Sequence, residues 1–459
     1  MVTGHTVIGN RYGININAGA EVKIRDIFEF DFILFAAVII LTFIGILTIR
    51  SAGINSEGVL TSNEYKKQII WGIIGTVSAV TVSFINVKYI YNASPFLYAA
   101  TILLLLYTLV GGKVVNSARS WLGFSDLGIQ PSEFAKITTI LFLSRYLIST
   151  QNKVESVRRF LVSSAIALLP MALVLLQPDF GTSLVFIPIF IIVCFVGGVS
   201  LKYILFIIAC IALTAFLTFV PIWQSYIIKK TIPIFTIIND NRFTMILLIG
   251  LSLVALLAAF SWIQYKRARF FWILYTAAIL IFSFGVSKIA QKILKEYQKM
   301  RLIVFLDPDV DPLGAGWNIN QSITAIGSGG ISGKGYLQGT QSHYRFIPQQ
   351  STDFIFSIFA EEWGFIGTVT IFALFFIVCF RLIRIMQKTA NEFGCYISAG
   401  MVALLVFHFF INVGMTMGIM PITGIPLPLI SYGGSATIST LLGIGFALNG
   451  YIYRIERDR

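Results

Sequence analysis

Charged side chains are scarce in this chain of 459 residues, where they make up 12% of the composition against 56% for hydrophobic residues. Soluble globular domains carry about 25% charged residues, so the composition excludes an ordinary soluble protein and predicts a membrane protein. The charge that is present is mainly positive, since 34 Lys and Arg face 21 Asp and Glu. The basic residues lie in short breaks between apolar runs, which argues against nucleic acid as a partner and indicates membrane topology.

Cysteine and histidine are also rare, with four and three copies respectively. The cysteines lie in or beside apolar runs without metal or redox spacing, so we interpret them as packing residues. The histidines are scattered, so the sequence suggests neither a His-based catalytic triad nor a zinc site. No Walker or dinucleotide-binding glycine pattern follows a predicted strand. Any chemistry must therefore come from carboxylates and basic groups.

Long apolar runs are abundant, and a bilayer core needs about 20 such residues per helix. They predict an all-α integral membrane protein, a polytopic bundle of about twelve transmembrane helices. The runs cover residues 32–47, 69–85, 96–110, 134–147, 161–176, 182–199, 203–220, 243–263, 270–286, 354–380, 397–417 and 436–451.

The loops between these runs predict four parts of the chain. Residues 1–31 lack the apolar core of a signal peptide and are expected to form a cytoplasmic tail. A transmembrane region at 32–290 precedes an extracytoplasmic loop at 291–353 and a second transmembrane region at 354–459. With a cytoplasmic tail, the Lys/Arg clusters fall on the cytoplasmic side. The opposite side then receives residues 51–67, 111–130, 177–181, 229–242, the long loop and 418–435.

The long loop is the most polar stretch of the chain. It carries Asp307, Asp309 and Asp311 among prolines and glycines, which constrain its backbone. Two interpretations remain open, an active-site loop or a solvated turn. Just upstream, residues 289–304 have helical apolar periodicity, with a second face bearing Lys292, Lys295 and Lys299. That helix would lie at the membrane surface beside anionic headgroups, or form the snorkelling end of the preceding helix.

Further ionisable residues lie close to the predicted apolar runs. Glu133 and Lys136 are three apart in the first turns of a helix opened by a proline, so they share a face. An ionisable pair there is costly unless it faces a polar cavity, which favours function over a structural ion pair. Asp179 breaks two apolar runs, and Glu361 lies about two turns inside the run at 354–380, which Asp353 opens. Asp353 is more simply interpreted as a helix N-terminal charge.

Several motifs together resemble the SEDS (shape, elongation, division and sporulation) family, in its RodA branch. They are Arg119 with Trp121, QPSE–AK at 130–136, QPDFGTS at 177–183, DPLGAG at 311–316, IGSGG–GKG at 326–335, STDFIFS–EEWG at 351–364 and GIPLPLISYGGS at 424–435. The last motif cannot be a regular helix, and irregular backbone near a membrane is tolerated where it is buried or lines a cavity.

The resemblance implies a peptidoglycan glycosyltransferase of the bacterial cytoplasmic membrane that serves cell elongation and shape. It would polymerise lipid II at the outer face and release undecaprenyl diphosphate, in partnership with a class B penicillin-binding transpeptidase and other membrane proteins of the elongation complex. The family's essential loop aspartate corresponds to Asp311, the expected general base, with Glu133 assisting it. Residues expected to bind substrate are Arg119, Trp121, Lys136, Asp179, Lys292, Lys295, Lys299, Asp353, Glu361 and Ser431. A divalent cation, Mg²⁺ or Mn²⁺, is a family expectation without a metal motif in the sequence.

The sequence departs from the family pattern in two places. Family members have about ten transmembrane helices, so the runs at about 243–286 are expected to be an inserted pair, which leaves the loop on the same side. Gln349, Gln350 and Ser351 stand where the family usually has an acid and a histidine. Two other functions remain open: a lipid II flippase, because buried acids and broken helices also mark transporters, and a non-catalytic scaffold for the transpeptidase.

Overall fold

The structure is a computed structural model that describes residues 30–115, 118–123, 128–153, 156–228, 232, 233, 235, 240–294 and 296–453. The predicted tail up to residue 29, the basic C-terminal cluster and Lys295 lie outside the described residues. Within the described chain, helices dominate, and the all-α prediction is confirmed.

Each of the twelve predicted apolar runs coincides with a helix, or in one case with two short consecutive helices. Nine helices of the described chain are long and apolar enough to cross a membrane. They are α2 (Phe32–Ala52), α4 (Val87–Gly111), α6 (Val157–Leu176), α9 (Leu201–Trp223), α11 (Asn241–Tyr265), α12 (Ala268–Ile293), α16 (Ile355–Lys388), α17 (Glu392–Thr416) and α18 (Gly434–Ile452). The remaining runs form α3 (Glu64–Ser83), α5 (Pro131–Ser149) and the consecutive pair α7 (Phe180–Leu184) and α8 (Phe186–Val196).

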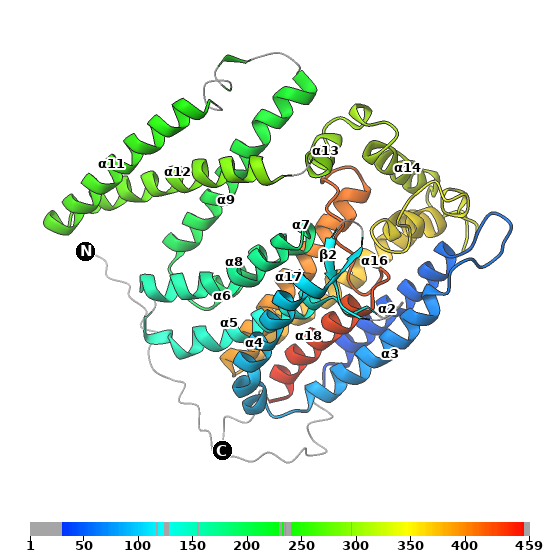
Figure 1. Ribbon diagram of the computed structural model, residues 1–459. Coiled ribbons are helices and arrows are strands. Elements are labelled where there is room, and N and C mark those ends of the chain that lie inside the picture. The colour runs from blue at the N-terminus through cyan, green and yellow to red at the C-terminus, as the bar shows by residue number, and fades with distance from the viewer. Residues whose placement is uncertain are drawn as a thin grey trace.

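Helices α17 and α18 lie at the centre of the bundle, where α17 packs on α5, α8, α16 and α18, and α18 packs on α3 (Figure 1). In their apolar stretches 61% and 72% of residues are buried, against 11% in α11. A helix that is apolar on all sides has no polar face to present to water, so it is either buried in protein or faces lipid. The contrast therefore separates a protein-packed core from an outlying helix.

Helices α9, α11 and α12 extend away from this core (Figure 1). The two apolar runs at 243–286 form helices α11 and α12, and α12 fastens this pair to α9. Three side chains of α12 donate hydrogen bonds to backbone carbonyls of α9: Tyr275 to Lys202 at 2.8 Å, Ser283 to Cys210 at 3.3 Å and Gln291 to Leu217 at 3.0 Å. The sequence separations of 73, 73 and 74 residues mean that the two helices run parallel and in register.

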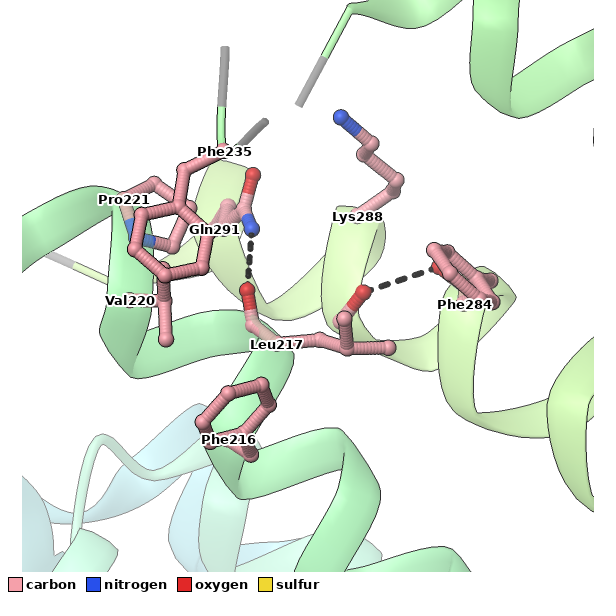
Figure 2. Close-up of a pocket in the computed structure, with 9 residues that line it drawn as sticks. Phe216, Leu217, Val220, Pro221, Phe235, Phe284, Lys288 and Gln291 are labelled. Carbon is pink, nitrogen blue, oxygen red and sulfur yellow. Dashed lines mark hydrogen bonds between the residues drawn. The ribbon is translucent and has the colours of Figure 1, made fainter. Parts of the chain in front are cut away.

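A small cavity lies at the outer part of the α9–α12 contact, beside the bond from Gln291 to Leu217 (Figure 2). Its wall is formed largely by apolar side chains, among them Phe216, Pro221 and Phe284. A volume of about 20 Å³ leaves room for about one water molecule. The contact is therefore a packed interface and not a ligand site.

The long loop is folded. It contains α13 (Glu296–Val304), the 3₁₀ turn η3 (Pro308–Val310), α14 (Ala315–Ser328) and α15 (Thr340–His343). A separate apolar cluster supports it, comprising Val304, Ile319, Ala325, Ile347, Phe354 and Ile422. This apolar cluster holds the loop against the bundle, whereas the acid-bearing turn η3 has no buried residue, as expected of a solvated turn.

The predicted continuous helix over residues 289–304 is wrong. Leu294 has an extended conformation, with φ −61° and ψ 118°, and separates α12 from α13. Lys292 is exposed at the end of α12, whereas Lys299 lies on α13 and forms a 2.7 Å ion pair with Glu296. The break at Leu294 therefore puts Lys292 and Lys299 on two different helices.

A short antiparallel hairpin was not predicted. Strands β1 (Lys113–Val115) and β2 (Ala118–Trp121) pair after α4, and the Arg119 amide donates to the Gln177 carbonyl at 3.2 Å. Strands this short carry too few alternating positions to give a periodic signal. The hairpin matters because it holds Trp121 beside the break between α6 and α7.

A buried arginine stabilises the end of the bundle opposite the hairpin. Arg159 of α6 is 2% exposed and donates to the carbonyls of Leu147 at 3.0 Å and Gly197 at 2.8 Å, next to the ends of α5 and α8. Helix ends leave carbonyls without intrahelical partners, so this side chain satisfies two helices at once.

We expect Arg159→Met to lower the stability of the purified protein by about 2 kcal/mol or more, because buried carbonyls lose their donor. Arg158→Met is the matched control, since Arg158 is exposed on the same turn. Thermal unfolding in detergent measures both. Equal melting temperatures for the two variants would contradict the assigned role of Arg159.

Candidate active site

A cavity of about 470 Å³ opens where the predicted outer-side segments meet. Its wall is built from separate parts of the chain: β2, the start of α5, the α6–α7 break, α9, the α12–α13 region, the end of the long loop, and the segment between α17 and α18. The side chains that bear on chemistry are Trp121, Glu133, Asp179, Tyr297, Arg301, Asp353 and Tyr432. Of the segments predicted to lie on the outer side, 111–130, 177–181, the long loop and 418–435 contribute residues to this wall.

Glu133 reaches the cavity wall from the first turn of α5, which Pro131 opens. Its carboxylate forms a 2.8 Å ion pair with Lys136, and the two residues are only 3% and 1% exposed. Lys136 itself is not part of the wall and lies behind Glu133. A buried pair of this kind holds the carboxylate in one orientation, since breaking it would leave a charge uncompensated.

Asp179 caps the N-terminus of α7. Its carboxylate accepts from the Thr182 amide at 3.2 Å and from the Gln130 side chain at 2.9 Å. Burial raises the pKa of Asp179, and the nearby Glu133 carboxylate adds to this, against the lowering effect of the Thr182 hydrogen bonds. Gly181 permits the segment to lie against the opposite wall, because a Cβ there would come within 2.3 Å of the Thr423 carbonyl oxygen.

Asp353 and Arg301 form the other side of the cavity. A Cβ on Gly424 would lie 3.4 Å from the Asp353 carboxylate and 3.8 Å from the Arg301 guanidinium, so both groups border one small space. Burial raises the pKa of Asp353, and the Arg301 charge opposes that rise. Among the described lining residues, Arg301 is the only Lys or Arg, and it shares the wall with the acids Glu133, Asp179 and Asp353.

The three acids of the long loop lie elsewhere. Asp311 is half-buried, and its Oδ2 accepts from the Ala315 amide at 2.9 Å, which caps α14. Asp307 similarly accepts from the Asp309 amide at 3.1 Å, while Asp309 is exposed. None of the three belongs to the described cavity wall. The structure therefore does not bring Asp311 and Glu133 together.

Other residues expected to bind substrate are engaged in the framework. Arg119 donates to the Leu109 carbonyl at 3.4 Å, and the Ser431 hydroxyl donates to the Thr352 carbonyl at 2.6 Å. Glu361 is fully buried and accepts from Lys334 at 2.6 Å and from two amides, of Thr340 and Gln341. It thereby fixes the glycine-rich part of the loop against α16. Of the predicted set, Trp121, Glu133, Asp179 and Asp353 share the cavity.

Sequence analysis did not identify two residues of this region. Arg301 begins the polar stretch, but sequence analysis assigned a binding role to the lysines upstream of it instead. Only the helix break at Leu294 directs Arg301 toward the cavity. His408 of α17 lies 3.3 Å from Lys136, at the back of the Glu133 pair. A single histidine in an apolar helix gives no signal by itself.

The described residues contain no group of three or more His, Cys, Asp or Glu side chains placed to hold a metal ion. Mg²⁺ commonly binds to one or two carboxylates together with substrate phosphates. Asp179 and Asp353 fit that pattern, because both carboxylates line the cavity. The groups beside Asp179 are mainly uncharged donors, and Asp353 has a single guanidinium, that of Arg301, nearby.

Comparisons with known proteins agree with this architecture. The chain is 44% identical over 427 residues to the peptidoglycan glycosyltransferase RodA of Treponema pallidum, covering 93% of this chain and 98% of that protein. It is 32% identical over 381 residues to the peptidoglycan glycosyltransferase MrdB of Escherichia coli K12, covering 83% and 84%.

Two solved structures have the same fold. One, described as "Structural coordination of polymerization and crosslinking by a peptidoglycan synthase complex", matches with a TM-score of 0.63 and 26% identity over 93% of this chain and 99% of that one. The rod shape determining protein RodA of Thermus thermophilus matches with a TM-score of 0.57 and 23% identity over 93% and 98%.

The family model described as "Cell cycle protein", FtsW/RodA/SpoVE, matches residues 31–240 and 222–455. These two matches span nearly all of the described chain, including every segment that lines the cavity. The chain therefore belongs to the FtsW/RodA/SpoVE family of cell cycle proteins.

Proposed function

We propose that this protein is a peptidoglycan glycosyltransferase that polymerises lipid II into glycan strands and releases undecaprenyl diphosphate. The observation that carries the proposal is the cavity, whose wall combines the carboxylates of Glu133, Asp179 and Asp353 with the guanidinium of Arg301 at the end of a membrane bundle. The 44% identity to a protein named as such an enzyme supports the same assignment.

The arrangement suits glycosyl transfer. A new glycosidic C–O bond forms as the anomeric C–O bond to the diphosphate breaks, and the proton of the attacking sugar hydroxyl passes to a carboxylate. A sugar hydroxyl is a weak nucleophile unless a positioned base accepts that proton. The departing diphosphate needs positive charge, which Arg301 supplies from the cavity wall. The apolar helices around the cavity accommodate the polyprenyl chain.

The identity of the base is a separate part of the proposal. Family resemblance assigns it to Asp311, and the DPLGAG motif supports that choice. Asp311 bonds to the first amide of α14 outside the cavity wall. To act as the base, it must reach the substrate from the start of α14, or the substrate must extend beyond the wall to reach it. Glu133, held by Lys136, orients the hydroxyl from within the cavity.

The setting follows from the same proposal. The cavity end faces the extracytoplasmic side of the bacterial inner membrane, and a class B penicillin-binding transpeptidase uses the glycan product. The similarity to a chain from a peptidoglycan synthase complex supports such a partner. A flippase is the second candidate, because a buried Glu133–Lys136 pair beside a cavity also suits a lipid-headgroup path across the membrane.

We expect Asp311→Asn to reduce polymerisation of purified lipid II by about 100-fold or more, because the carboxylate can no longer accept a proton. Asp309→Asn, an exposed neighbour, is the matched control and should stay near wild type. Gel analysis of glycan strands, with and without a cognate transpeptidase, measures both. Retained activity in Asp311→Asn would move the base to the cavity acids. Lipid II transport across vesicles by a wild type that makes no polymer would favour the flippase.

We expect Arg301→Gln to lower kcat/KM by about 10-fold or more, because the diphosphate loses its cationic partner. Arg301 also lowers the pKa of Asp353, so its removal raises that pKa and extends the protonated form to higher pH. If ionised Asp353 supports turnover, the acid limb of the pH–rate profile moves upward. Arg345→Gln, an exposed arginine that bonds to Thr61, is the control. An unchanged rate and profile would exclude Arg301 from the site.

We expect chelation by EDTA to reduce polymerisation by about 10-fold or more and Mg²⁺ or Mn²⁺ to restore it, because the substrate diphosphate and cavity carboxylates together offer oxygen ligands. Asp179→Asn should then need a higher cation concentration for half-maximal rate. Activity that is indifferent to EDTA would assign neutralisation of the diphosphate to Arg301 alone.

A further inference from the structure

His408 links the cavity's ion pair to the opposite wall. The residue lies on α17 and is 3% exposed. Its Nε2 is 3.3 Å from the Lys136 ammonium, and its Nδ1 is 3.1 Å from the Pro426 carbonyl oxygen. Lys136 in turn pairs with Glu133 at 2.8 Å, and both Glu133 and Pro426 line the cavity. The chain Glu133–Lys136–His408–Pro426 therefore starts and ends at the cavity wall.

The partners of the imidazole determine its protonation. The Pro426 carbonyl can only accept, so Nδ1 must carry the hydrogen and donate it. The Lys136 ammonium can only donate, so Nε2 must offer a lone pair. A doubly protonated ring would instead direct an N–H at a cation. The geometry therefore requires neutral His408 in a single tautomer, with one acceptor and one donor both in use.

The surrounding packing restricts the movement of these four linked residues. Helices α5 and α17 approach closely at Gly400, where a Cβ would lie 2.7 Å from Ile140. One turn beyond His408, Asn412 donates to the Ile425 carbonyl at 2.8 Å and to the Asp353 carbonyl at 2.9 Å. Helix α17 thus holds the non-helical wall through two side chains, but only His408 also contacts the ion pair.

We propose that His408 is a positioning residue for the glycosyl transfer: by accepting from Lys136 while donating to Pro426, it fixes the direction of the Lys136–Glu133 pair relative to the cavity. The inference rests on the proposed function. His408 does not touch the substrate; it acts through Lys136, whose ammonium would otherwise be free to turn toward other acceptors and release Glu133.

Two amide replacements separate the two contacts. The amide of Gln extends as far as Nε2 of histidine, so His408→Gln retains an acceptor for Lys136. The amide of Asn ends near the position of Nδ1, so His408→Asn retains the donor to Pro426 and loses the contact with Lys136. We expect His408→Gln to keep polymerisation within about 3-fold of wild type, and His408→Asn to lower kcat about 10-fold or more with KM little changed.

The control on the same helix is Ser398→Ala, which removes a buried hydroxyl bonded within α17 to the Gly394 carbonyl at 2.8 Å. It should leave the rate unchanged. Thermal unfolding of every variant monitors the fold. A merely structural role for His408 would make the rates follow the melting temperatures, with Gln and Asn losing activity in proportion to stability, and that result would overturn the proposal.

A double-mutant cycle tests the path through Lys136. In a Lys136→Met background, His408→Asn should cost less than 2-fold, because its effect already requires Lys136. The same cost in both backgrounds would overturn the proposal. If wild type makes no polymer, the proposed function fails. Non-additive melting temperatures of the two variants would then still report the His408–Lys136 contact, and additive ones would refute it.

Discussion

The non-helical segment between α17 and α18 imposes the constraint on which the rest of the structure depends. Backbone amides and carbonyls at membrane depth have no water to bond to, so the protein itself must satisfy them. Polar side chains from two helices do so here: Asn412 and His408 of α17 contact the carbonyls of Ile425 and Pro426, and Gln68 of α3 accepts from the Gly433 amide at 3.2 Å. Ser431 closes the segment on itself by accepting from the Leu427 amide at 2.8 Å.

This requirement explains why the cavity and the buried polar residues occur together. The side chains that hold the segment must be carried by α3 and α17, and they bring those helices to the same level as the start of α5 and the α6–α7 break. The space left between straight helices and an irregular wall is the cavity. Its acids are then tolerated because each has a partner: Glu133 has Lys136, Asp179 has the Thr182 amide, and the charge of Arg301 favours ionised Asp353.

Much of this architecture could be predicted from the sequence, for reasons that are physical. Apolar runs of bilayer length fix the helices, and the two prolines and three glycines at 424–434 indicate the non-helical segment. The motifs gave Glu133, Asp179 and Asp353 their place at the outer side. By contrast, the break at Leu294 carries no glycine or proline, so nothing in the pattern revealed that Arg301 would turn inward while Lys299 pairs with Glu296.

Pairings across the fold were also beyond sequence reasoning. His408 meets Lys136 only because two helices far apart in the chain approach at Gly400, a contact that one sequence does not specify. The loop acids show the converse. Their motif identified Asp311, but its side chain bonds locally to Ala315, and only the folded loop shows that it caps a helix outside the cavity wall.

In the parallel pair of α9 and α12, one helix contributes to the cavity wall and the other leads into the long loop. Ala215 of α9 lines the cavity, whereas the chain enters the long loop from α12, through Leu294. Leu294 lines the cavity as well, so α9 and the end of the α11–α12 pair both contribute to its wall. Helix α12 runs parallel to α9, and three of its side chains bond to backbone carbonyls of α9. The chain therefore enters the long loop close to the part of the cavity wall that α9 forms. The hairpin of α11 and α12 thus lies at the periphery of the bundle (Figure 1), while the chain still enters the long loop beside the cavity.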